Sequence, residues 1–474
     1  FRNNPSILFY ESGNESISKE HMLEMIAIRD KYDPYGGRAM GSREMLDIRE
    51  AEWGGEMLYI NKSEHHPMFA TEYCRDEGLR KYWDEYSYPF HKEGAGPLHR
   101  GQDASIYNHN QDMFAVELIR RWYDYWRERP GTGRRVSSGG AKIIFSDTQT
   151  HRRGEENYRR SGVVDPLRIP KDGFFAHKVM WDGWVDTEKE HTYIMGHWNY
   201  SPDVVKPVYV VSTGDKVELF VNGKSKGFGK QDYRFLFTFE KIQWEEGMIE
   251  AVSYNEFGKE LSRYSIKTVG EPERLKLTLI HGPEGLFADG ADLAMIQVEV
   301  VDSNGNRCPL ANNKISFDLQ GPAEWRGGIA QAADNYVLAK ALPVECGITR
   351  VLVRSTGKAG KITIKAEASG LVSDEVSLTS IPVKVENGLS KFFPSEKLAS
   401  RFDRGETPLT PSYKNSKVDV RVKSAFAGVN SEEAVNSFDG NELSEWKNDG
   451  RLNTAWITYR LERKAEIDDI CIKL

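Results

Sequence analysis

The sequence predicts a multidomain chain in which part of a parallel α/β barrel is followed by β-sandwiches. Its 474 residues are 39% hydrophobic and 28% charged, which is typical of a globular protein with room for three or four domains of ~100–200 residues. Over the first ~185 residues, short apolar strands alternate with amphipathic helices, which predicts a parallel sheet. From about Val185 onward, short strands alternate with glycine-containing turns, which is typical of β-sandwiches.

The α/β part contains the elements of an incomplete barrel. A first strand over Ser6–Tyr10 precedes a helix over Lys19–Tyr32, for which Ser18 is a suitable N-cap. Further strands are predicted over Arg38–Gly41, Glu56–Ile60, Pro67–Tyr73 and Ala141–Phe145, and further helices over Met113–Trp126 and Phe174–Trp181. A closed (β/α)8 barrel has eight strands and about five are visible, so we expect the missing strands to precede Phe1.

The all-β part divides into two sandwiches and a last β segment. The first sandwich has predicted strands over Val208–Ser212, Val217–Asn222, Phe235–Glu240, Met248–Tyr254 and Leu261–Thr268, with a turn at Asn222-Gly223. The second has predicted strands over Arg274–Ile280, Ala294–Val301, Lys314–Leu319, Thr349–Arg354 and Lys361–Ala366, with a hairpin turn at Asp302-Ser303-Asn304-Gly305. We therefore expect domains at residues 1–184, 185–270, 271–386 and 417–474, with a linker over 387–416.

Charge and cysteine content narrow the classes of function. The net charge of −7 and the lack of a basic run with interleaved aromatics argue against a nucleic-acid partner. The sequence contains no run of about 18 apolar residues, so it predicts no membrane-spanning helix. The cysteines Cys74, Cys308, Cys346 and Cys471 form no CxxC pair and have no metal-ligand spacing, so no metal is expected. Cys308 and Cys346 fall in one β-rich segment and could pair, but two free thiols are the favoured expectation.

Two glutamates stand at the ends of predicted parallel strands. Glu15 follows the strand Ser6–Tyr10, and Glu72 ends the strand Pro67–Tyr73. Side chains at these strand ends converge on one mouth of a βα barrel. Two carboxyl groups about 5 Å apart define a retaining glycosidase. A glycoside hydrolase therefore competes with a non-catalytic binding module and with a structural protein of immunoglobulin-like repeats, in which each glutamate would cap or form a salt bridge.

The residues around both glutamates resemble known motifs. Asn4 to Ser16 reads NPSILFYESGNES, and Pro67 to Tyr73 reads PMFATEY. The first stretch resembles the acid/base motif of glycoside hydrolase family 2, the β-galactosidase and β-glucuronidase family, and the second resembles its nucleophile motif. The resemblance implies a retaining β-glycosidase with Glu15 as acid/base, Asn14 as ligand of the sugar 2-hydroxyl and Glu72 as nucleophile.

The resemblance covers most of the chain. Val163–Asp165 and Arg168–Lys171 resemble the last barrel turn of the family, and Gly196–Tyr200 with Val217–Gly227 resembles a sandwich of Bacteroidetes-type members. Trp325–Gly328 with Ala359–Thr363 resembles their immunoglobulin-like domain, and Ser437–Asn441 with Trp446 and Trp456 resembles the start of a discoidin-like module. The implied fold is the C-terminal part of a (β/α)8 barrel, then all-β immunoglobulin-like sandwiches and an incomplete discoidin-like module. Membership would also imply a periplasmic or secreted protein.

Three positions that depart from the family pattern bear on which sugar the site would accept. On the last predicted barrel strand, where members carry a Trp that lines the sugar site, Phe145 would supply an apolar face and Asp147 would hydrogen-bond a hydroxyl. Arg75 stands where a galactosidase subgroup has His, and its planar fork suits a carboxylate or sulfate unless it pairs with a neighbouring acid. Tyr59 stands near where members place a Tyr that hydrogen-bonds the nucleophile.

The resemblance favours a β-galactosidase that acts on the non-reducing end of oligosaccharides or polysaccharide fragments. The Asn-x-Lys motif with which glucuronidases bind the uronic carboxylate is absent, and Asn157-Tyr158-Arg159 is only loosely similar. A β-glucuronidase, or a galactosidase for sulfated or substituted galactosides, is the alternative, and a non-catalytic carbohydrate-binding protein is the alternative of another class. We expect a carbohydrate partner and no cofactor, and self-association stays open.

Overall fold

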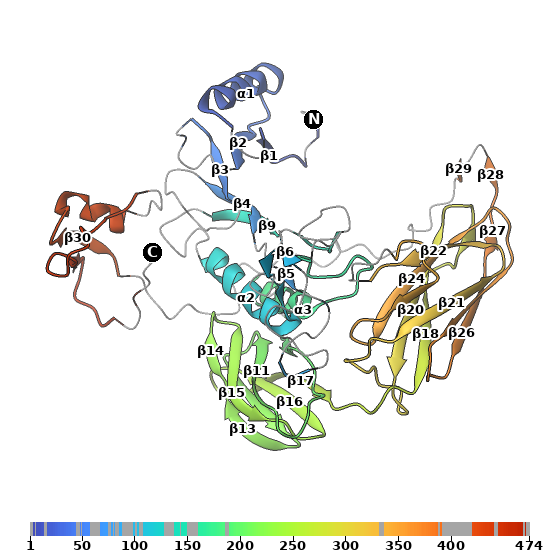
Figure 1. Cartoon of the computed structure of the whole chain (residues 1–474). Helices are drawn as coiled ribbons and strands as arrows, with labels where there is room; N and C mark the ends of the chain where they lie inside the picture. The colour runs from blue at the N-terminus through green and yellow to red at the C-terminus, as the bar shows by residue number, and fades with distance from the viewer. Residues whose placement is uncertain are drawn as a thin grey trace. The chain divides into compact units, whose positions relative to one another are not determined.

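A computed structural model describes most of the two sandwiches and parts of the remaining chain (Figure 1). The described residues are 3–4, 6–13, 17–43, 48, 50–56, 67–73, 77–78, 80, 85–87, 98–99, 102–103, 108–127, 137–142, 144–148, 160–184, 189–330, 336–386, 389–390, 420–439, 444–467 and 470. They fall into two compact units. The first comprises residues 1–75, 120–143 and 414–474, and the second comprises residues 76–119 and 144–413.

The first unit contains a five-stranded parallel sheet. Its strands, in spatial order, are β1 (Phe9–Glu11), β2 (Ala39–Arg43), β3 (Trp53–Glu56), β4 (Met68–Tyr73) and β9 (Ser137–Lys142). Every neighbouring pair is parallel, so all five carboxyl ends lie on one edge of the sheet. Helix α1 (Lys19–Tyr32) connects β1 to β2, and the Ser18 side chain caps it by accepting a hydrogen bond from the His21 N–H at 3.2 Å. The predicted helix bounds and N-cap are confirmed.

Close packing fixes the centre of this sheet. Met22 of α1 packs with Met40 and Ala51 in a small buried cluster. Gly41 must be glycine, because a Cβ there would lie 2.2 Å from the Trp53 carbonyl oxygen. The Trp53 indole N–H in turn donates to the Tyr10 carbonyl at 3.0 Å, which ties β3 across β2 to β1.

Three predicted strands are displaced in the structure. The strand predicted over Ser6–Tyr10 starts only at Phe9, because the Asn4 side chain accepts hydrogen bonds from both the N–H and the hydroxyl of Ser6 and holds a turn there. The strand predicted over Ala141–Phe145 is β9, which instead includes Gly139-Gly140 and ends at Lys142. The strand predicted over Glu56–Ile60 is β3, which ends at Glu56, and residues 57–60 lie outside the described ones.

Among its described residues, the N-terminal part of the second unit contains four strands of two residues each and two longer helices. Strand β5 (Glu77–Gly78) pairs in parallel with β8 (Asn108–His109), and β6 (Leu98–His99) pairs with β7 (Gln102–Asp103). Helix α2 (Gln111–Arg127) starts in this unit, where it buries Phe114 and Leu118, and α3 (Asp172–Trp184) buries Val179 and Met180. Both helices extend beyond their predicted bounds.

The first sandwich, green in Figure 1, packs two four-stranded sheets. One sheet has the order β10-β11-β15-β14 and the other β13-β12-β16-β17. The strands are β10 (Thr192–Ile194), β11 (Val205–Ser212), β12 (Lys216–Val221), β13 (Lys224–Phe228), β14 (Lys230–Asp232), β15 (Leu236–Gln243), β16 (Met248–Tyr254) and β17 (Glu260–Lys267). In β12 every second side chain is fully buried, namely Val217, Leu219 and Val221, as expected of a half-buried strand. Asn222 and Gly223 both have positive φ, which confirms the predicted turn.

The second sandwich, yellow to orange in Figure 1, has sheets of order β18-β20-β24-β22 and β23-β21-β25-β26. The strands are β18 (Arg274–Ile280), β20 (Leu293–Val301), β21 (Lys314–Gln320), β22 (Ala323–Gly328), β23 (Ala341–Pro343), β24 (Ile348–Ser355), β25 (Lys361–Glu367) and β26 (Asp374–Thr379), with the short pair β19 (Phe287–Ala288) and β27 (Ile381–Pro382) beside them. The predicted turn after β20 is present, since the Gly305 N–H donates to the Asp302 carbonyl. Cys308 and Cys346 are buried and free, which confirms that expectation.

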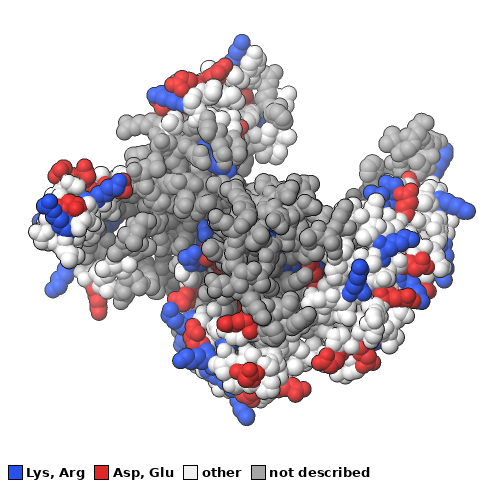
Figure 2. Space-filling model, viewed as in Figure 1, with Lys and Arg blue, Asp and Glu red and all other residues white. Residues whose placement is uncertain are grey.

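The last described segment is small. Strand β30 (Val422–Ala427) pairs antiparallel with β31 (Ile457–Leu461), and the 3-10 helix η3 (Ser431–Ser437) lies between them in sequence. Strands β28 (Val385–Glu386) and β29 (Leu389–Ser390) pair with each other, and residues 391–419 of the predicted linker lie outside the described ones. None of the helices described here is both long and apolar enough to cross a membrane. On the face shown in Figure 2, acidic and basic side chains are interspersed over the described parts of the two sandwiches.

Candidate active site

The carboxyl edge of the parallel sheet is the candidate active site. Glu72 is the penultimate residue of β4, so its backbone lies at this edge. Strand β1 ends on the same edge at Glu11, and the chain then runs through Ser12 and Gly13 toward Asn14. The predicted site residues Asn14, Glu15, Tyr59 and Arg75 lie outside the described residues, and only the backbone of Glu72 is described.

Hydrogen bonds to β2 hold the chain as it leaves β1. The Ser12 N–H donates to the Gly41 carbonyl at 2.9 Å, and the Ser42 hydroxyl donates to the Gly13 carbonyl at 2.6 Å. Ser42 is fully buried, so its bond to Gly13 is shielded from water. The backbone that leads into Asn14 is therefore tied to the neighbouring strand over its last two described residues.

Glu11, at the end of β1, is itself a carboxylate of this edge. Partial burial raises its pKa, and a hydrogen bond from the Arg43 backbone opposes that shift. Arg43 ends β2 and is almost fully buried. Acidic and basic groups thus accompany the carboxyl ends of β1 and β2.

A buried ion pair fixes the start of β1. The Arg38 guanidinium pairs with Asp33 at 2.5 Å and donates to the carbonyls of Ile7 at 2.8 Å and Asn4 at 2.9 Å. The Tyr10 hydroxyl donates to the same Asp33 carboxylate at 2.8 Å, which raises the pKa of Tyr10. The backbone carbonyls of Asn4 and Ile7 are therefore anchored by Arg38, which Asp33 holds in place, and neither residue belongs to the motif at Asn4 to Ser16. Their only signal in the sequence is a pair of opposite charges that flank the turn before β2.

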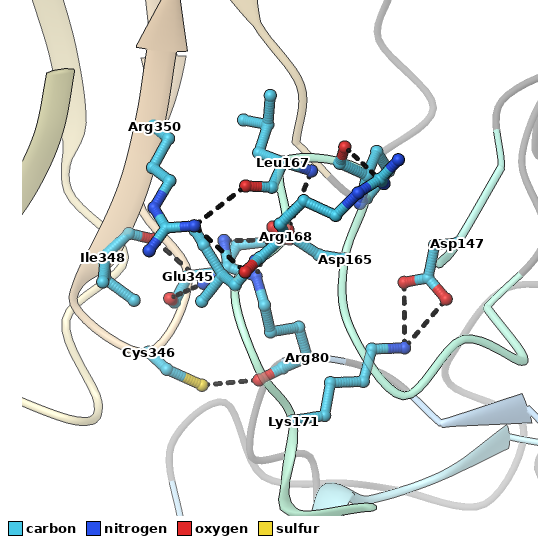
Figure 3. A network of polar contacts seen from close by, with 12 residues as sticks. Arg80, Asp147, Asp165, Leu167, Arg168, Lys171, Glu345, Cys346, Ile348 and Arg350 are labelled. Atoms are coloured by element: carbon cyan, nitrogen blue, oxygen red, sulfur yellow. Dashed lines mark hydrogen bonds and ion pairs between the residues drawn. The ribbon is translucent and has the colours of Figure 1, made fainter. Parts of the chain in front are cut away.

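Phe145 and Asp147, predicted to contact the sugar, lie in the second unit in contrasting environments. Phe145 is 57% exposed, whereas Asp147 is 3% exposed. The Asp147 carboxylate lies 2.8 Å from the Lys171 ammonium and accepts a hydrogen bond from the Gly162 N–H at 2.8 Å (Figure 3). Burial raises the pKa of Asp147 to about 6, and the Lys171 charge opposes the rise. Lys171, which sequence reasoning left without a role, is thus the direct partner of Asp147.

A second buried network of polar contacts joins Arg80 and the turn at residues 165–168 to the second sandwich. Arg80, 1% exposed, lies 3.2 Å from the Asp165 carboxylate and 3.1 Å from the Glu345 carboxylate, and donates to the backbone carbonyls of Glu345 and Ile348. Arg350 donates to the carbonyls of Leu167 and Arg168, each at 3.0 Å. Figure 3 shows both arginines reaching toward the turn at residues 165–168. These contacts are structural, since each charged group is met by a protein partner.

A cavity of about 230 Å³ lies where α3 meets both sandwiches. Asp172 lines it together with Tyr193, Arg307 and Cys346. The Asp172 carboxylate accepts hydrogen bonds from the Tyr193 hydroxyl at 2.9 Å and the Gly196 N–H at 2.8 Å. Burial nevertheless raises the pKa of Asp172 to about 7. Within the described part of the chain, no group of three or more His, Cys, Asp or Glu residues is arranged to hold a metal ion.

Comparison with known families and proteins shows which family the chain resembles. Residues 277–377 match the family described as Glycoside hydrolase family 2 C-terminal domain 5, and residues 203–262 match a domain of unknown function (DUF4982). A β-glucuronidase of Formosa agariphila is 36% identical over 408 residues, which are 83% of this chain and 39% of that protein. The β-galactosidase BoGH2A of Bacteroides ovatus is 32% identical over 222 residues, 44% of this chain and 24% of that protein.

Solved structures agree with the sequence relatives. The structure of a β-glucuronidase from glycoside hydrolase family 2 superposes with a TM-score of 0.72 at 35% identity, covering 83% of this chain and 40% of that one. A family 2 member from Bacteroides cellulosilyticus shares the fold with a TM-score of 0.59 at 20% identity, over 80% of this chain and 49% of that one. The chain spans about two fifths of the Formosa relative and about a quarter of the Bacteroides ovatus one. The family domain at residues 277–377, together with relatives and structures of one family along most of the chain, shows that this chain belongs to glycoside hydrolase family 2.

Proposed function

We propose that this chain carries the two catalytic carboxylates of a retaining β-glycosidase, with Glu72 as nucleophile and Glu15 as acid/base. The observation that carries the proposal is the position of Glu72 at the carboxyl end of β4, in the same parallel sheet as β1. The chain that leaves β1 at this edge reaches Glu15 four residues after Glu11. Retaining cleavage of a glycosidic bond uses two carboxyl groups about 5 Å apart, and side chains at the carboxyl ends of neighbouring parallel strands can supply them.

The strand register aligns the end of β1 with the start of β4. Glu11 is the partner of Gly41, Gly41 is the partner of Trp53, and Gly54, the next residue, is the partner of Met68. Counting back one residue, Glu11 is level with Pro67. In the sequence, Glu15 follows Glu11 by four residues and Glu72 follows Pro67 by five.

The proposed reaction is a double displacement. The ionised Glu72 carboxylate attacks the anomeric carbon while the protonated Glu15 donates its proton to the leaving oxygen. Glu15, now ionised, then takes a proton from the water that attacks the glycosyl-enzyme and releases the sugar with retained configuration. The negative charge of a neighbouring Glu72 and burial would both raise the pKa of Glu15 and keep it protonated for the first step.

A β-galactoside is the first candidate substrate and a β-glucuronide the second. The galactoside is favoured by the lack of the Asn-x-Lys motif that holds a uronic carboxylate in glucuronidases. The glucuronide is favoured by the Formosa agariphila relative, a β-glucuronidase that matches 83% of this chain. The Arg75 guanidinium, three residues after Glu72, is the group in this sequence best suited to an anionic sugar.

The remaining expectations belong to the same proposal. We propose that the five-stranded sheet is part of a (β/α)8 barrel and that the segment around β30 and β31 is part of a discoidin-like module. A periplasmic or secreted location, a carbohydrate partner and the predicted domain bounds at residues 184, 270, 386 and 416 are proposed with it.

The test is covalent trapping of the nucleophile in the intact protein. An activated 2-deoxy-2-fluoro-β-galactoside and its glucuronide counterpart should inactivate the enzyme and leave one sugar on the peptide that contains Glu72, as measured by mass spectrometry. Glu72→Gln should abolish both turnover of aryl β-glycosides and labelling. Glu11→Gln, which changes another carboxylate of the same sheet edge, is the matched control and should retain both. Labelling on a different peptide, or substantial hydrolysis by Glu72→Gln, would overturn the assignment.

A further inference from the structure

The cavity of about 230 Å³ lies among three parts of the second unit. Residues that line it come from the start of α3, from β10 and β17 of the first sandwich, and from the segment between β20 and β21 of the second sandwich. Sites for drug-sized ligands typically occupy about 300–1,000 Å³, so this cavity suits a smaller molecule, on the order of one ring. A ligand held there would contact all three parts.

Asp172, the first residue of α3, places a buried carboxylate in the cavity wall. Its two hydrogen bonds come from the Tyr193 hydroxyl at 2.9 Å and the Gly196 N–H at 2.8 Å. A carboxylate can accept about four hydrogen bonds, so these two donors fill about half of its capacity. Burial raises the pKa of Asp172 to about 7, because the two donors do not replace the water that the carboxylate has lost. A ligand hydroxyl that donates to Asp172 would supply part of what is missing.

Arg307 brings a positive charge to the same cavity from the second sandwich. This charge opposes the rise in the pKa values of Asp172, Tyr193 and Tyr264, so the guanidinium lies near all three groups. Among the described residues, none forms an ion pair with Arg307 or a hydrogen bond with its side chain. Arg307 is exposed, so an anion that enters from solvent can reach its N–H donors.

Aromatic rings line the cavity beside Asp172. The Phe175 and Tyr193 rings stack with their centroids 4.4 Å apart and their planes at 15°, and the Tyr193 and Tyr264 centroids are 5.0 Å apart. The Tyr264 hydroxyl forms no hydrogen bond with any residue that the structure describes, so it can serve as a donor or an acceptor for a ligand. The rings thus offer apolar area and one further polar group.

We propose that this cavity binds a small hydroxylated carboxylic acid, such as a sugar acid, whose hydroxyl donates to Asp172 and whose carboxylate meets Arg307. The inference does not depend on the glycosidase proposal, because every group that carries it belongs to the second unit.

Other classes of small ligand fit the cavity less well. A purely apolar molecule would displace water from Asp172 without replacing its hydrogen bonds, which is costly for a buried carboxylate. A simple anion without a hydroxyl would meet Arg307 but would face the Asp172 carboxylate without a donor for it. A simple cation would suit Asp172 but would be repelled by Arg307. Only a molecule that carries both a hydroxyl donor and a negative charge satisfies the two residues together.

Three ring compounds of similar size separate the two contacts. D-glucuronate carries hydroxyls and a carboxylate, D-glucose carries hydroxyls alone, and cyclohexanecarboxylate carries the charge alone. Titration calorimetry with the intact protein, in a buffer without carboxylates, gives the affinity for each. We expect D-glucuronate to bind about tenfold or more tightly than either of the others, because only this compound makes both contacts. Hydrogen exchange should slow in the peptide that contains Gly196, whose N–H is bonded to Asp172.

The variants assign each contact to its residue. Arg307→Met should weaken D-glucuronate binding about tenfold and leave D-glucose unchanged, since it removes only the charge-assisted hydrogen bonds. Asp172→Asn should reduce the preference for D-glucuronate over cyclohexanecarboxylate. Arg326→Met is the matched control, because Arg326 is an exposed arginine of the same sandwich that does not line the cavity, and it should bind all three compounds as the wild type does. Should Asp172→Asn not fold, Tyr264→Phe, which removes a hydroxyl without breaking a hydrogen bond in the protein, takes its place and should weaken D-glucuronate binding severalfold.

The proposal is overturned if D-glucuronate does not bind, if all three compounds bind equally, or if Arg307→Met binds D-glucuronate as tightly as Arg326→Met does. Slower exchange confined to the peptide that contains Glu72 would place D-glucuronate at the proposed active site and would also overturn it. Failure of the glycosidase proposal is recognised separately, because a protein that hydrolyses no glycoside can still bind D-glucuronate beside Gly196. Glu72→Gln should accordingly keep the wild-type protection of that peptide.

Discussion

The Arg80 guanidinium lies 3.1 Å from the Glu345 carboxylate, although 265 residues separate them in the sequence. Arg80 follows β5 by two residues, and Glu345 lies in the turn before β24 of the second sandwich. The second carboxylate of the network, Asp165, lies 3.2 Å from the same guanidinium and also accepts hydrogen bonds from the N–H groups of Leu167 and Ile169. Buried Arg80 therefore joins the second sandwich to the turn that precedes α3.

Replacing Arg80 with methionine should destabilise the second unit strongly. The substitution keeps an apolar side chain of similar length but leaves the Asp165 and Glu345 carboxylates buried without their cation. Breaking a buried pair in this way costs about 3–5 kcal/mol. Urea unfolding followed by tryptophan fluorescence would measure the loss.

The control for Arg80 is Arg354→Met in the same sandwich. Arg354 pairs with Glu324, but both side chains are partly exposed, at 38% and 50%. Exposed pairs contribute at most about 1 kcal/mol, so this variant should unfold close to the wild type. An Arg80→Met variant as stable as Arg354→Met would show that the buried network does not hold the sandwich in place.

The free energy of unfolding should fall toward neutral pH because of Asp172. Burial raises its pKa from 3.8 to about 7 in the folded protein, so the folded state binds this proton more tightly than the unfolded state. The resulting stabilisation is complete below pH 4 and is lost as the pH rises through about 7. At about 1.4 kcal/mol for each pKa unit, the contribution of Asp172 to the free energy of unfolding falls by roughly 4 kcal/mol between pH 4 and a pH above 7.

The Asp172 prediction is measured as the difference between wild type and Asp172→Asn. The asparagine can still accept one hydrogen bond and cannot ionise, so its unfolding temperature should decline less between pH 5 and pH 7.5. Part of the decline should persist in this variant, because burial also raises the pKa of Asp147, to about 6. Parallel curves for wild type and variant over this range would contradict the assignment.

Local signals explain what the sequence predicted well. The bounds of α1 follow from Ser18 as N-cap and from the polar turn after Tyr32, and the β12–β13 turn follows from Asn222-Gly223, which suits positive φ at both positions. Strands with an alternating buried face, such as β12 and β20, were predictable for the same reason. By contrast, β13 (Lys224–Phe228) and β26 (Asp374–Thr379) were not predicted. Neither has a buried side chain, and β26 has only two apolar residues on its inner face, Val376 and Leu378, which is too short a pattern to mark a strand.

Long-range pairing explains what the sequence did not reveal in the candidate site. Asp147 was predicted as a sugar ligand from its place on the last predicted barrel strand, and only the fold shows that Lys171, 24 residues later, meets it in a buried site. The Arg80–Glu345 pair is more distant still and has no local pattern. Charged residues carry the same letters whether they are buried or solvated, so their partners emerge only from the packing of whole domains.

Loss of the acid/base should be visible as a change of rate-limiting step. In Glu15→Ala, substrates with good leaving groups need no proton for the first displacement, so the glycosyl-enzyme should form and then hydrolyse slowly. Azide, a small anion that needs no general base, should restore turnover and yield a β-glycosyl azide. The measurement is steady-state rate against azide concentration with an activated aryl glycoside, and Glu11→Ala, which should be active and unaffected by azide, is the control. Indifference of Glu15→Ala to azide would remove Glu15 from this role.

Arg75 should decide between a neutral and an anionic sugar. If its guanidinium receives a uronic carboxylate or a sulfate, Arg75→His removes a charge-assisted hydrogen bond of about 1.5–3 kcal/mol, and kcat/KM for the aryl β-glucuronide should fall by roughly 10–150-fold. The aryl β-galactoside has no charge for Arg75 to meet, so its kcat/KM should change by no more than a few fold, and the ratio of the two values is the measurement. A fall of equal size for both substrates would mean that Arg75 pairs with a neighbouring acid and only shapes the site. Arg75→Lys separates charge from geometry: a retained charge without the planar fork should recover part of the glucuronide activity, because a lysine attracts a carboxylate but cannot bind both of its oxygens in parallel.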